Sequence, residues 1–228
     1  MNTRASFAFA AAALLALASL PALAALKPFS ADYSASYMGL QGNARMTLAP
    51  EGAHQWRYTL DVKSAVAQLS QSTLFEEADG GWRPLSGRDA SSVLIKKSDR
   101  QASYDWTAGQ ASWSGDVKPE RRGPVALRTG DLDAMLLNLA IVRDVQAGKT
   151  SRTYRMVDNG RAKPMSYRVV GKDTVSFGGK PHPATRVSVP DGSRETVMWV
   201  AEDVPVPVRI LRRHKGEDEM DLKLVAID

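Results

Sequence analysis

Apolar and polar residues alternate along most of the chain, which is the pattern of half-buried β-strands. Aromatic and alanine side chains alternate with serine and aspartate over residues 29–37, and every second residue is apolar over residues 56–62. Turn residues separate these runs. The clearest turn is Asp158-Asn159-Gly160, because Asn-Gly between two apolar runs is the strongest short signal of a β-hairpin. The pattern predicts roughly 11 to 13 strands.

One segment has helical spacing instead. Its apolar residues recur three or four positions apart: Leu132, Met135, Leu136, Leu139 and Val142. Asp131 precedes them as an N-cap residue, and Gly148 follows as a residue that ends a helix in the left-handed conformation. These signals predict a helix over about residues 131–147. Residues 65–77 fit a strand or a helix equally well.

This order of elements predicts a mostly β fold. So many antiparallel strands do not stay a flat sheet; they curl, close or split into two layers. We expect a strongly curved or barrel-like antiparallel sheet, with the central helix packed against it through its leucine and methionine residues. No linker, repeat or low-complexity segment divides the chain, so residues 25–228 are expected to form a single β-rich domain.

The first 24 residues have the three parts of a secretory signal peptide. Arg4 supplies the positive end, an apolar run extends from Phe7 to Leu20, and Ala22-Leu23-Ala24 is a small-residue cleavage site. The run is shorter and richer in alanine than a membrane-spanning helix requires. We therefore expect export by the Sec route, removal of this N-terminal signal helix near Ala24, and a periplasmic protein without an integral membrane span.

Composition limits the chemistry and the partners. The chain has no cysteine, which excludes disulfides, thiolate chemistry and a cysteine-linked lipid anchor. The formal net charge is +5, and the basic residues are scattered in short clusters. A solvated basic face accounts for this mild bias, and binding to an anionic envelope surface is the alternative. Nucleic acid is not an expected partner, because it is not normally present in the periplasm.

Three segments spread over nearly the whole predicted mature chain carry a family resemblance. They read FSADYSASYMGLQGNARMTL, GDLDAMLLNLAIVRDVQAGK and TVMWVAEDVPVPVRIL. They resemble the first hairpin, the Asp-led central helix and the late Trp-containing strand of an exported bacterial family, the domain of unknown function DUF3108. The resemblance implies a periplasmic β-rich fold, and it implies no activity or residue roles. The segment Pro205-Val206-Pro207 departs from the family pattern and is expected to stiffen the edge of that strand.

No catalytic, metal-binding or cofactor-binding motif stands out. His54, His182 and His214 lie far apart in turn-like contexts, so a metal site is not expected. The chain has no G-x-S-x-G elbow, and Gly178-Gly179 precedes no predicted helix, so neither a serine nucleophile nor a phosphate-binding loop is predicted. Two carboxylates across a cleft, as in a glycosidase, stay an open alternative. We expect no cofactor, and a non-enzymatic protein rather than an enzyme.

Aromatic residues on the predicted strands are the candidate ligand contacts. A hairpin whose turn is Gly109-Gln110 would place Trp106 directly opposite Trp113, on one face of the sheet. Packing in a closed core accounts for such aromatic residues. The alternative is that they form the wall of an apolar pocket on the concave face of a curved sheet. In that case the ligand-binding residues are Trp106, Trp113, Trp56 and Tyr58.

Three functions fit these observations. The first is a non-enzymatic envelope protein that binds an apolar or amphipathic ligand, a lipid or a lipoprotein segment, on the inner face of the sheet. The second is a structural or assembly factor that binds an envelope protein through an exposed sheet edge. The third is a hydrolase of a cell-envelope component. The sequence specifies neither the ligand, the partner nor the oligomeric state.

Overall fold

The computed structural model describes residues 26–78 and 80–228. The predicted signal peptide, residues 1–24, lies outside the described residues, so its cleavage stays a prediction. Among the described residues, no helix is long and apolar enough to cross a lipid bilayer.

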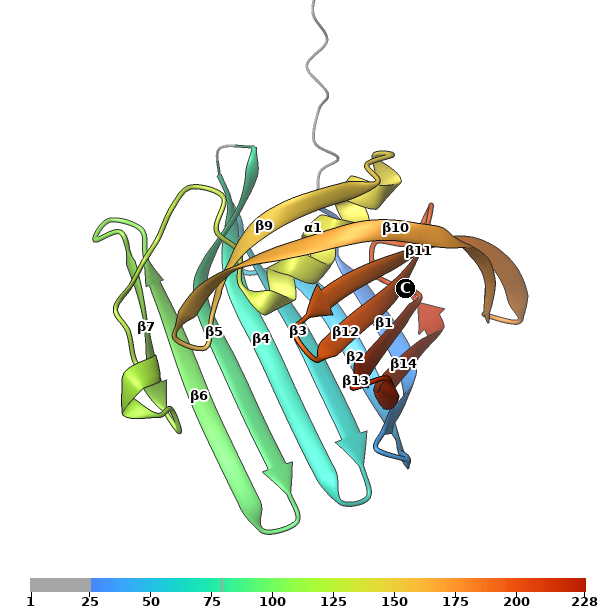
Figure 1. The fold of residues 1–228 in the computed structure, drawn as a ribbon, viewed down its shortest axis with the longest axis horizontal. Coiled ribbons are helices and arrows are strands. Elements are labelled where there is room, and N and C mark those ends of the chain that lie inside the picture. The colour runs from blue at the N-terminus through green and yellow to red at the C-terminus, as the bar shows by residue number, and fades with distance from the viewer. Residues whose placement is uncertain (1–25, 79) are drawn as a thin grey trace, which may run out of the picture.

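The described residues form one antiparallel sheet of 14 strands with a single α-helix (Figure 1). The elements in chain order are β1 (Phe29–Tyr37), β2 (Leu40–Pro50), β3 (Gln55–Ser64), β4 (Ala67–Ala78), β5 (Gly81–Val93), β6 (Lys96–Asp105), β7 (Gln110–Gly115), the 3₁₀ turn η1 (Pro119–Arg121), β8 (Val125–Ala126), α1 (Ala134–Gln146), β9 (Ser151–Asp158), β10 (Arg161–Phe177), β11 (Lys180–Asp191), β12 (Arg194–Ala201), β13 (Arg209–His214) and β14 (Glu217–Ile227). Their spatial order is β8-β7-β6-β5-β4-β3-β2-β1-β14-β13-β12-β11-β10-β9.

This architecture confirms the predicted fold class and refines its elements. The segment that fitted a strand or a helix is a strand, β4, which pairs along its length with β3 and β5. Residues 165–177 lie in one long strand, β10, which contains a β-bulge between Val169 and Gly171. The segment between β7 and α1 contains η1 and the two-residue strand β8. The sheet therefore has more strands than the pattern predicted.

The sheet curls around α1, and its two ends approach each other (Figure 1). The hydroxyl group of Tyr104 on β6 donates a hydrogen bond of 3.0 Å to the carbonyl oxygen of Val157 on β9. Arg121 in η1 donates one of 2.9 Å to the carbonyl oxygen of Asn159, in the turn between β9 and β10. The β9–β10 hairpin thus closes most of the gap between the first and last strands of the sheet.

The central helix begins two residues later than an N-cap at Asp131 would require. Asp133 is the N-cap, and its carboxylate accepts a hydrogen bond from the backbone N–H of Leu136. Asp131 instead accepts bonds from the backbone N–H of Arg128 and from the side chain of Arg155, 24 residues away. A long-range ion pair therefore takes Asp131 out of the capping position, which corrects the predicted boundary.

The C-terminal end of the helix follows the prediction. Gly148 has a φ of 80°. Its N–H donates a hydrogen bond to the carbonyl oxygen of Val145, and the N–H of Lys149 donates one to the carbonyl oxygen of Asp144. These two bonds form a Schellman motif, which satisfies carbonyl groups that the helix leaves free. Since glycine reaches positive φ without a steric cost, Gly148 ends the helix at the predicted place.

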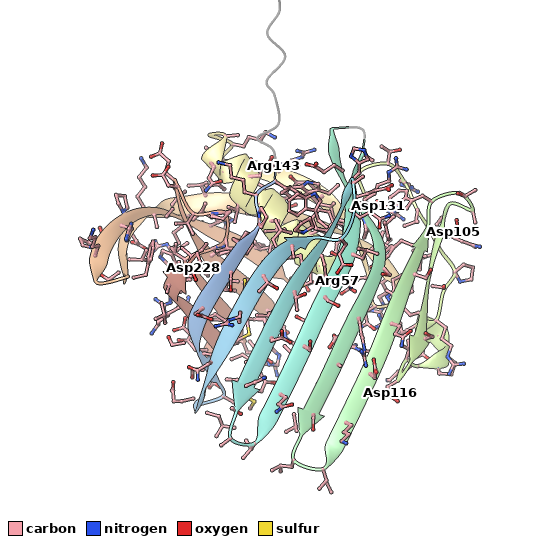
Figure 2. All side chains as sticks on the ribbon, turned by 180° about the vertical axis from the view of Figure 1, so that it is seen from behind. Arg57, Asp105, Asp116, Asp131, Arg143 and Asp228 are labelled. Carbon is pink, nitrogen blue, oxygen red and sulfur yellow. The ribbon has the colours of Figure 1, made fainter. Side chains whose placement is uncertain are left out.

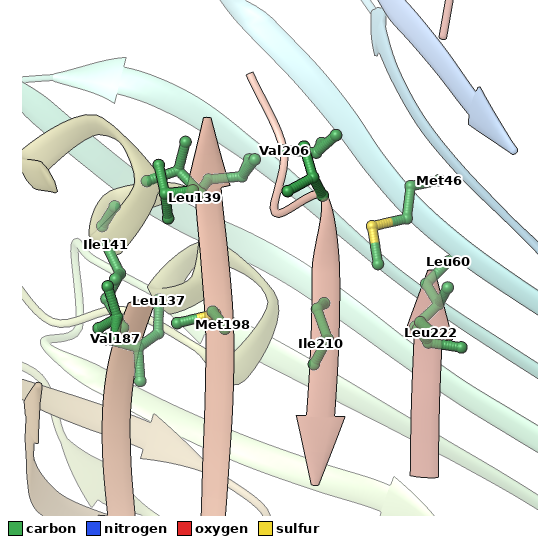
Figure 3. Packing of buried hydrophobic residues seen from close by; sticks show 14 of the residues in the cluster. Met46, Leu60, Leu137, Leu139, Ile141, Val187, Met198, Val206, Ile210 and Leu222 are labelled. Atoms are coloured by element: carbon green, nitrogen blue, oxygen red, sulfur yellow. The ribbon is translucent and has the colours of Figure 1, made fainter. Parts of the chain in front are cut away.

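The helix fills the upper part of the space inside the curved sheet. Leu136 and Leu139 are both buried, as the helical spacing predicted. Figure 3 shows side chains of α1 packed with those of β11 and β12, beside side chains from the other walls of the sheet. The labelled residues are Met46, Leu60, Leu137, Leu139, Ile141, Val187, Met198, Val206, Ile210 and Leu222. Burial of this apolar surface is the main stabilising contribution to the fold.

The segment Pro205-Val206-Pro207 does not form a strand edge. It lies in the loop between β12 and β13, where Val206 and Pro207 are buried. The hydroxyl group of Tyr33 donates a hydrogen bond of 2.9 Å to the carbonyl oxygen of Pro207. This loop closes the upper part of the core, and the expectation of a stiffened edge is wrong.

Candidate ligand-binding lumen

The inner face of the sheet is buried beside the helix and partly exposed away from it. On β3 the inward side chains of Tyr58 and Leu60 are 1% and 7% exposed, whereas that of Val62 is half-buried. On β4 Thr73 is buried, whereas Leu69, nearer the β3–β4 turn, is half-buried. The inner surface is therefore filled by α1 above and left partly open below.

We call this open part of the inner face the lumen. The register of the strands places its residues on one face of the sheet, because directly paired residues share a face. Its wall on β3–β6 consists of half-buried residues, with both apolar and polar side chains: Val62, Ser64, Ala67, Leu69, Gln71, Asp89, Ser91, Ser98 and Arg100. Such a mixed, partly exposed concave surface is typical of a site for a ligand with apolar and polar parts.

Three polar side chains form a bonded cluster on the lumen wall. Asp89 on β5 accepts a hydrogen bond of 3.3 Å from the amide of Gln71 on β4. It also forms an ion pair with Arg100 on β6. Asp89 directly opposes both residues in the sheet, which explains why the three side chains meet. The guanidinium group of Arg100 can bind an anionic or polar headgroup through its remaining donors.

A second carboxyl group, that of Asp158, lies within electrostatic reach of this cluster. Asp158 is the last residue of β9, and burial raises its pKa. The charges of Arg100 and Lys163 act in the opposite direction, and that of Asp89 adds to the rise. The end of the β9–β10 hairpin therefore brings a carboxyl group, which burial favours in its neutral form, towards the Asp89–Arg100 pair.

Asp133, the N-cap of α1, lies above the lumen. Its carboxyl group accepts a hydrogen bond of 2.5 Å from the hydroxyl of Thr73, which is two residues from Gln71 on the same face of β4. Burial raises the pKa of Asp133 to about 6, against the lowering effect of the bonds from Leu136 and Thr73. A proton on this carboxyl group is therefore gained or lost in the range of physiological pH.

The four aromatic residues predicted to bind a ligand occupy different surroundings. Tyr58 is buried in the main core, where its hydroxyl lies 3.3 Å from the sulfur of Met46, and Trp56 is half-buried at the edge of that core. Trp113 is buried in a second, smaller cluster, with its ring centroid 6.1 Å from that of Tyr104. A ligand-binding role for these residues stays a prediction.

The predicted contact between Trp106 and Trp113 is wrong. Asp105 pairs with Gln110 across the hairpin, so the turn has four residues, 106–109, and Trp113 pairs with Ala102. Trp106 lies in the turn, and its indole N–H donates a hydrogen bond of 2.7 Å to the carbonyl oxygen of Pro84. The indole N–H of Trp113, by contrast, is buried and has no acceptor among the described residues. That unpaired donor is the feature that still favours a ligand near Trp113.

The residues of the polar cluster were not predicted from the sequence. Gln71 lies in the segment that fitted a strand or a helix, so its face was undefined. The available signal was the interruption of apolar residues at inward positions of neighbouring strands. That signal becomes readable only when the strand pairing is known, because a one-residue shift moves every side chain to the other face.

Two depressions border the sheet, and the lining of the larger one combines outward residues with Val62, Leu69, Ser91 and Ser98 of the lumen wall. One has a volume of about 320 Å³. Its outward lining residues form two rows across β3–β6, and Asp61 belongs to one row and Lys63 to the other. The other, of about 230 Å³, lies between β1 and β14. The outer face otherwise carries ion pairs such as the bidentate Arg45–Asp32 pair. Arg57, which pairs with Glu51, is labelled in Figure 2.

The described part of the chain contains no candidate metal-binding site. No group of three or more histidine, aspartate or glutamate residues there could hold a metal ion. His54 is exposed, and His182 stacks on Phe177 with ring centroids 3.8 Å apart.

Comparison with known structures supports the fold. The chain is similar to the beta-barrel-like protein of domain of unknown function DUF1849 from Brucella abortus, with a TM-score of 0.54 and 14% sequence identity. The match covers 88% of this chain and 97% of that chain. At this identity the likeness shows the fold alone.

Two further solved structures match more weakly. They are MucB, with a TM-score of 0.32 and 13% identity, and the MucA/MucB complex of Pseudomonas aeruginosa, with a TM-score of 0.31 and 12% identity. Each match covers 88% of this chain, which spans about half of the matched chain (52% and 51%). Scores this low carry no argument about this protein. No curated protein sequence matches significantly.

The family comparison covers most of the chain. The model described as "Protein of unknown function (DUF3108)" matches residues 29–223, from the first strand into β14, and includes all three segments that carried the resemblance. The protein therefore belongs to the DUF3108 family.

Proposed function

We propose that this protein is a periplasmic envelope protein that binds an amphipathic ligand, a lipid or the lipidated segment of another envelope protein, in its lumen. The observation that carries the proposal is the change in exposure along the inner face of β3 and β4, from buried beside α1 to half-buried below it. The inner face of a small barrel is normally filled by side chains. Here its lower part offers surface to a ligand.

The two chemical parts of the ligand have separate partners in the lumen. Val62 and Leu69 pair directly across β3 and β4 and present apolar surface. The Gln71–Asp89–Arg100 cluster lies next to them and nearer the helix. A chain along Val62 and Leu69, with a polar group at Arg100, would remove apolar surface from water and keep the polar group hydrogen-bonded.

We do not propose docking through a sheet edge, because neighbouring segments already occupy part of each edge. At one edge, β8 and the adjacent loop bond to β7, for example through the N–H of Trp113 and the carbonyl oxygen of Arg122. At the other edge, Leu132 exchanges backbone hydrogen bonds with Arg155 and Val157 of β9. These bonds reduce the number of backbone groups that are free to pair with an added strand.

We do not propose a hydrolase function either, because the carboxyl groups at the lumen are poorly suited to it. Asp89 belongs to the lumen cluster, and Asp158 interacts electrostatically with it. One carboxylate oxygen of Asp89 already binds both Gln71 and Arg100. A pair of glycosidase carboxylates needs one member free to act as base or nucleophile, and ion pairing with Arg100 opposes that role for Asp89.

A probe titration tests the proposal with a matched pair of variants. Leu69→Trp places a large side chain in the lumen, whereas Gln68→Trp places the same side chain on the outer face, one residue away. Wild type and Gln68→Trp should bind a fluorescent lysophospholipid saturably. Leu69→Trp should bind it at least about tenfold more weakly, because the indole occupies the apolar contact surface.

Each outcome has a clear meaning when circular dichroism shows that both variants are folded. Equal weakening in both variants would place the probe outside the lumen. No saturable binding by the wild type, at any probe concentration below micelle formation, would contradict the proposal.

A further inference from the structure

Exposed large hydrophobic residues gather at one end of the barrel. Nine such residues occur in the described part of the chain, and seven of them lie on the turns β1–β2, β3–β4 and β5–β6. We call these seven the apolar rim: Tyr37, Met38, Leu40, Val66, Val93, Leu94 and Ile95. Ile95 is the most exposed, at 98%.

The three turns are neighbours in space. Every second hairpin of an antiparallel meander turns at the same end, and Figure 1 shows the β3–β4 and β5–β6 turns projecting together. The N–H of Leu94 donates a hydrogen bond of 3.0 Å to the carbonyl oxygen of Val66, which links those two turns directly. Gly42, at the start of β2, pairs with Ser64 at the end of β3 and brings the first turn alongside.

The backbone of two of these turns would favour other residues. Leu94 has a φ of 53° and Met38 a φ of 47°, a region that asparagine, aspartate and glycine occupy at least cost. At the matching position of the β9–β10 turn the same protein uses Asn159, with a φ of 47°. Turn geometry and solubility would therefore both favour a polar residue or glycine at positions 94 and 38. Packing within the fold does not explain the apolar side chains there, because both are more than two-thirds exposed.

Positive charge accompanies two turns of the apolar rim, β3–β4 and β5–β6. The β1–β2 turn lies beside Asp218 and Glu219, whose charges are paired with arginine residues. Lys63, Lys96 and Lys97 flank the β3–β4 and β5–β6 turns and are exposed. None of them takes part in an ion pair with a described residue. Residues 62–70 and 90–98 contain no acidic residue. Apolar side chains with adjacent lysines match a surface that is apolar inside and anionic outside.

We propose that the apolar rim docks onto the surface of a bilayer containing anionic phospholipid, with Leu94 and Ile95 inserted among the acyl chains. Lys63, Lys96 and Lys97 then lie at the level of the phosphate groups. The charge complementarity selects an anionic bilayer over a second copy of this chain, because the rim of a copy would carry the same positive charge. This docking does not require the lumen to bind a ligand, although the rim borders the open end of the lumen.

Vesicle binding tests the docking with a variant that does not strain the fold. Leu94→Asn with Ile95→Gly removes the most exposed apolar residues and introduces the turn sequence already used at residues 159–160. Val225→Asn changes an exposed hydrophobic residue away from the rim and is the control. Each protein is isolated as expressed, and its N-terminus is established by intact mass, so that all variants share the same terminus.

Wild type and Val225→Asn should co-sediment with vesicles of phosphatidylcholine and phosphatidylglycerol. The turn variant should partition at least about tenfold less onto them, because it loses the burial of two large aliphatic side chains. Replacing each of the three lysines by glutamine should weaken binding by roughly fivefold per lysine, and added salt should weaken it further. Vesicles of phosphatidylcholine alone should bind the wild type weakly.

Insertion can also be measured at the rim itself. The chain has no cysteine, so Ile95→Cys and Ala108→Cys, in the β6–β7 turn at the opposite end, each provide one labelling site. An environment-sensitive fluorophore should shift to the blue with anionic vesicles at the first site only.

Three results would overturn the proposal. The first is absence of vesicle binding by the wild type, and the second is equal binding by the turn variant. The third is a dimer in solution that the turn variant converts to a monomer, which would assign the rim to self-association.

Discussion

Replacement of Asp133 by asparagine should stabilise the protein at neutral pH and remove part of its pH dependence. The carboxyl group of Asp133 is buried, and its pKa in the folded protein is about 6, against 3.8 as its ordinary value. Each unit of pKa difference corresponds to about 1.4 kcal/mol, so ionised Asp133 costs the folded state about 3 kcal/mol at neutral pH. The protonated carboxyl group carries no such cost. Its stabilising effect relative to the ionised form is fully present below the unfolded pKa and is lost as the pH rises through the folded pKa.

The asparagine variant should keep the local structure. Its amide oxygen can accept the bond from the backbone N–H of Leu136, and its NH₂ group can donate to the hydroxyl oxygen of Thr73, so each partner of Asp133 keeps one hydrogen bond, with Thr73 now as the acceptor. Asparagine and aspartate are about equally good N-caps. The lost interaction of the charge with the helix dipole offsets about 0.3–1 kcal/mol. The expected net gain at neutral pH is about 2 kcal/mol.

Urea unfolding followed by tryptophan fluorescence measures both effects. Between about pH 7.5 and pH 5 the wild type should gain about 1.4 kcal/mol in its free energy of unfolding from this group, whereas Asp133→Asn should gain none from it. Asp131→Asn, two residues away, is the control: it breaks the ion pair with Arg155 and should destabilise. A less stable Asp133→Asn variant, or one with the wild-type pH dependence, would refute the account of this buried carboxyl group.

Three further predictions concern packing, a turn and processing. Leu136→Ala should lower the free energy of unfolding by about 2–5 kcal/mol, because Leu136 is fully buried. Asn138→Ala on the same helix should change it by less than about 0.5 kcal/mol. Equal midpoints of urea unfolding in the two variants would contradict the packing of Leu136. Gly160→Ala should lower the free energy of unfolding by at least about 1 kcal/mol more than Gly39→Ala. Both glycines have positive φ, but of the two only Gly160 would place a Cβ 2.1 Å from a backbone oxygen. Similar losses in thermal or urea unfolding would show that the neighbouring loop moves aside. Protein from a periplasmic extract should begin at Ala25, and an intact mass that still includes residues 1–24 would contradict the predicted cleavage.

The local elements of the fold could be read from the sequence because their signals are local. The alternation of apolar and polar residues defined most of the strands. Asn159-Gly160 forms the predicted turn, with positive φ at both residues. Proline favours the edge of a sheet or the start of a strand. Pro164 lies within β10, where it pairs with Arg155 of β9 but lies beyond the residues that pair with β11. It thus occupies a local edge, where a missing N–H costs no hydrogen bond.

The errors arose where distant residues decide between similar local signals. Asp131 and Asp133 are both good N-caps, and the choice between them depends on Arg155, whose position in space the sequence does not give. The turn before β7 has a local determinant that was overlooked. Asp105 accepts a hydrogen bond of 2.8 Å from the backbone N–H of Ala108 and so favours the longer turn.

The lumen cluster required knowledge of the register between strands. Gln71, Asp89 and Arg100 belong to three different strands, and a bulge between Leu74 and Phe75 shifts the pairing of β4 with β5. A polar residue at an inward position cannot be recognised until that shift is known. The aromatic residues, by contrast, were conspicuous in the sequence, and two of the four are buried in packed clusters.

Native mass spectrometry of the protein released gently from the periplasm tests the lumen proposal most directly. The account predicts a complex whose mass exceeds that of the polypeptide by one lipid-sized molecule, and this molecule should be lost on collisional activation. Gln68→Trp should retain the adduct, and Leu69→Trp should lack it. A wild-type spectrum that contains only the bare polypeptide, or an adduct that persists equally in Leu69→Trp, would contradict ligand binding in the lumen.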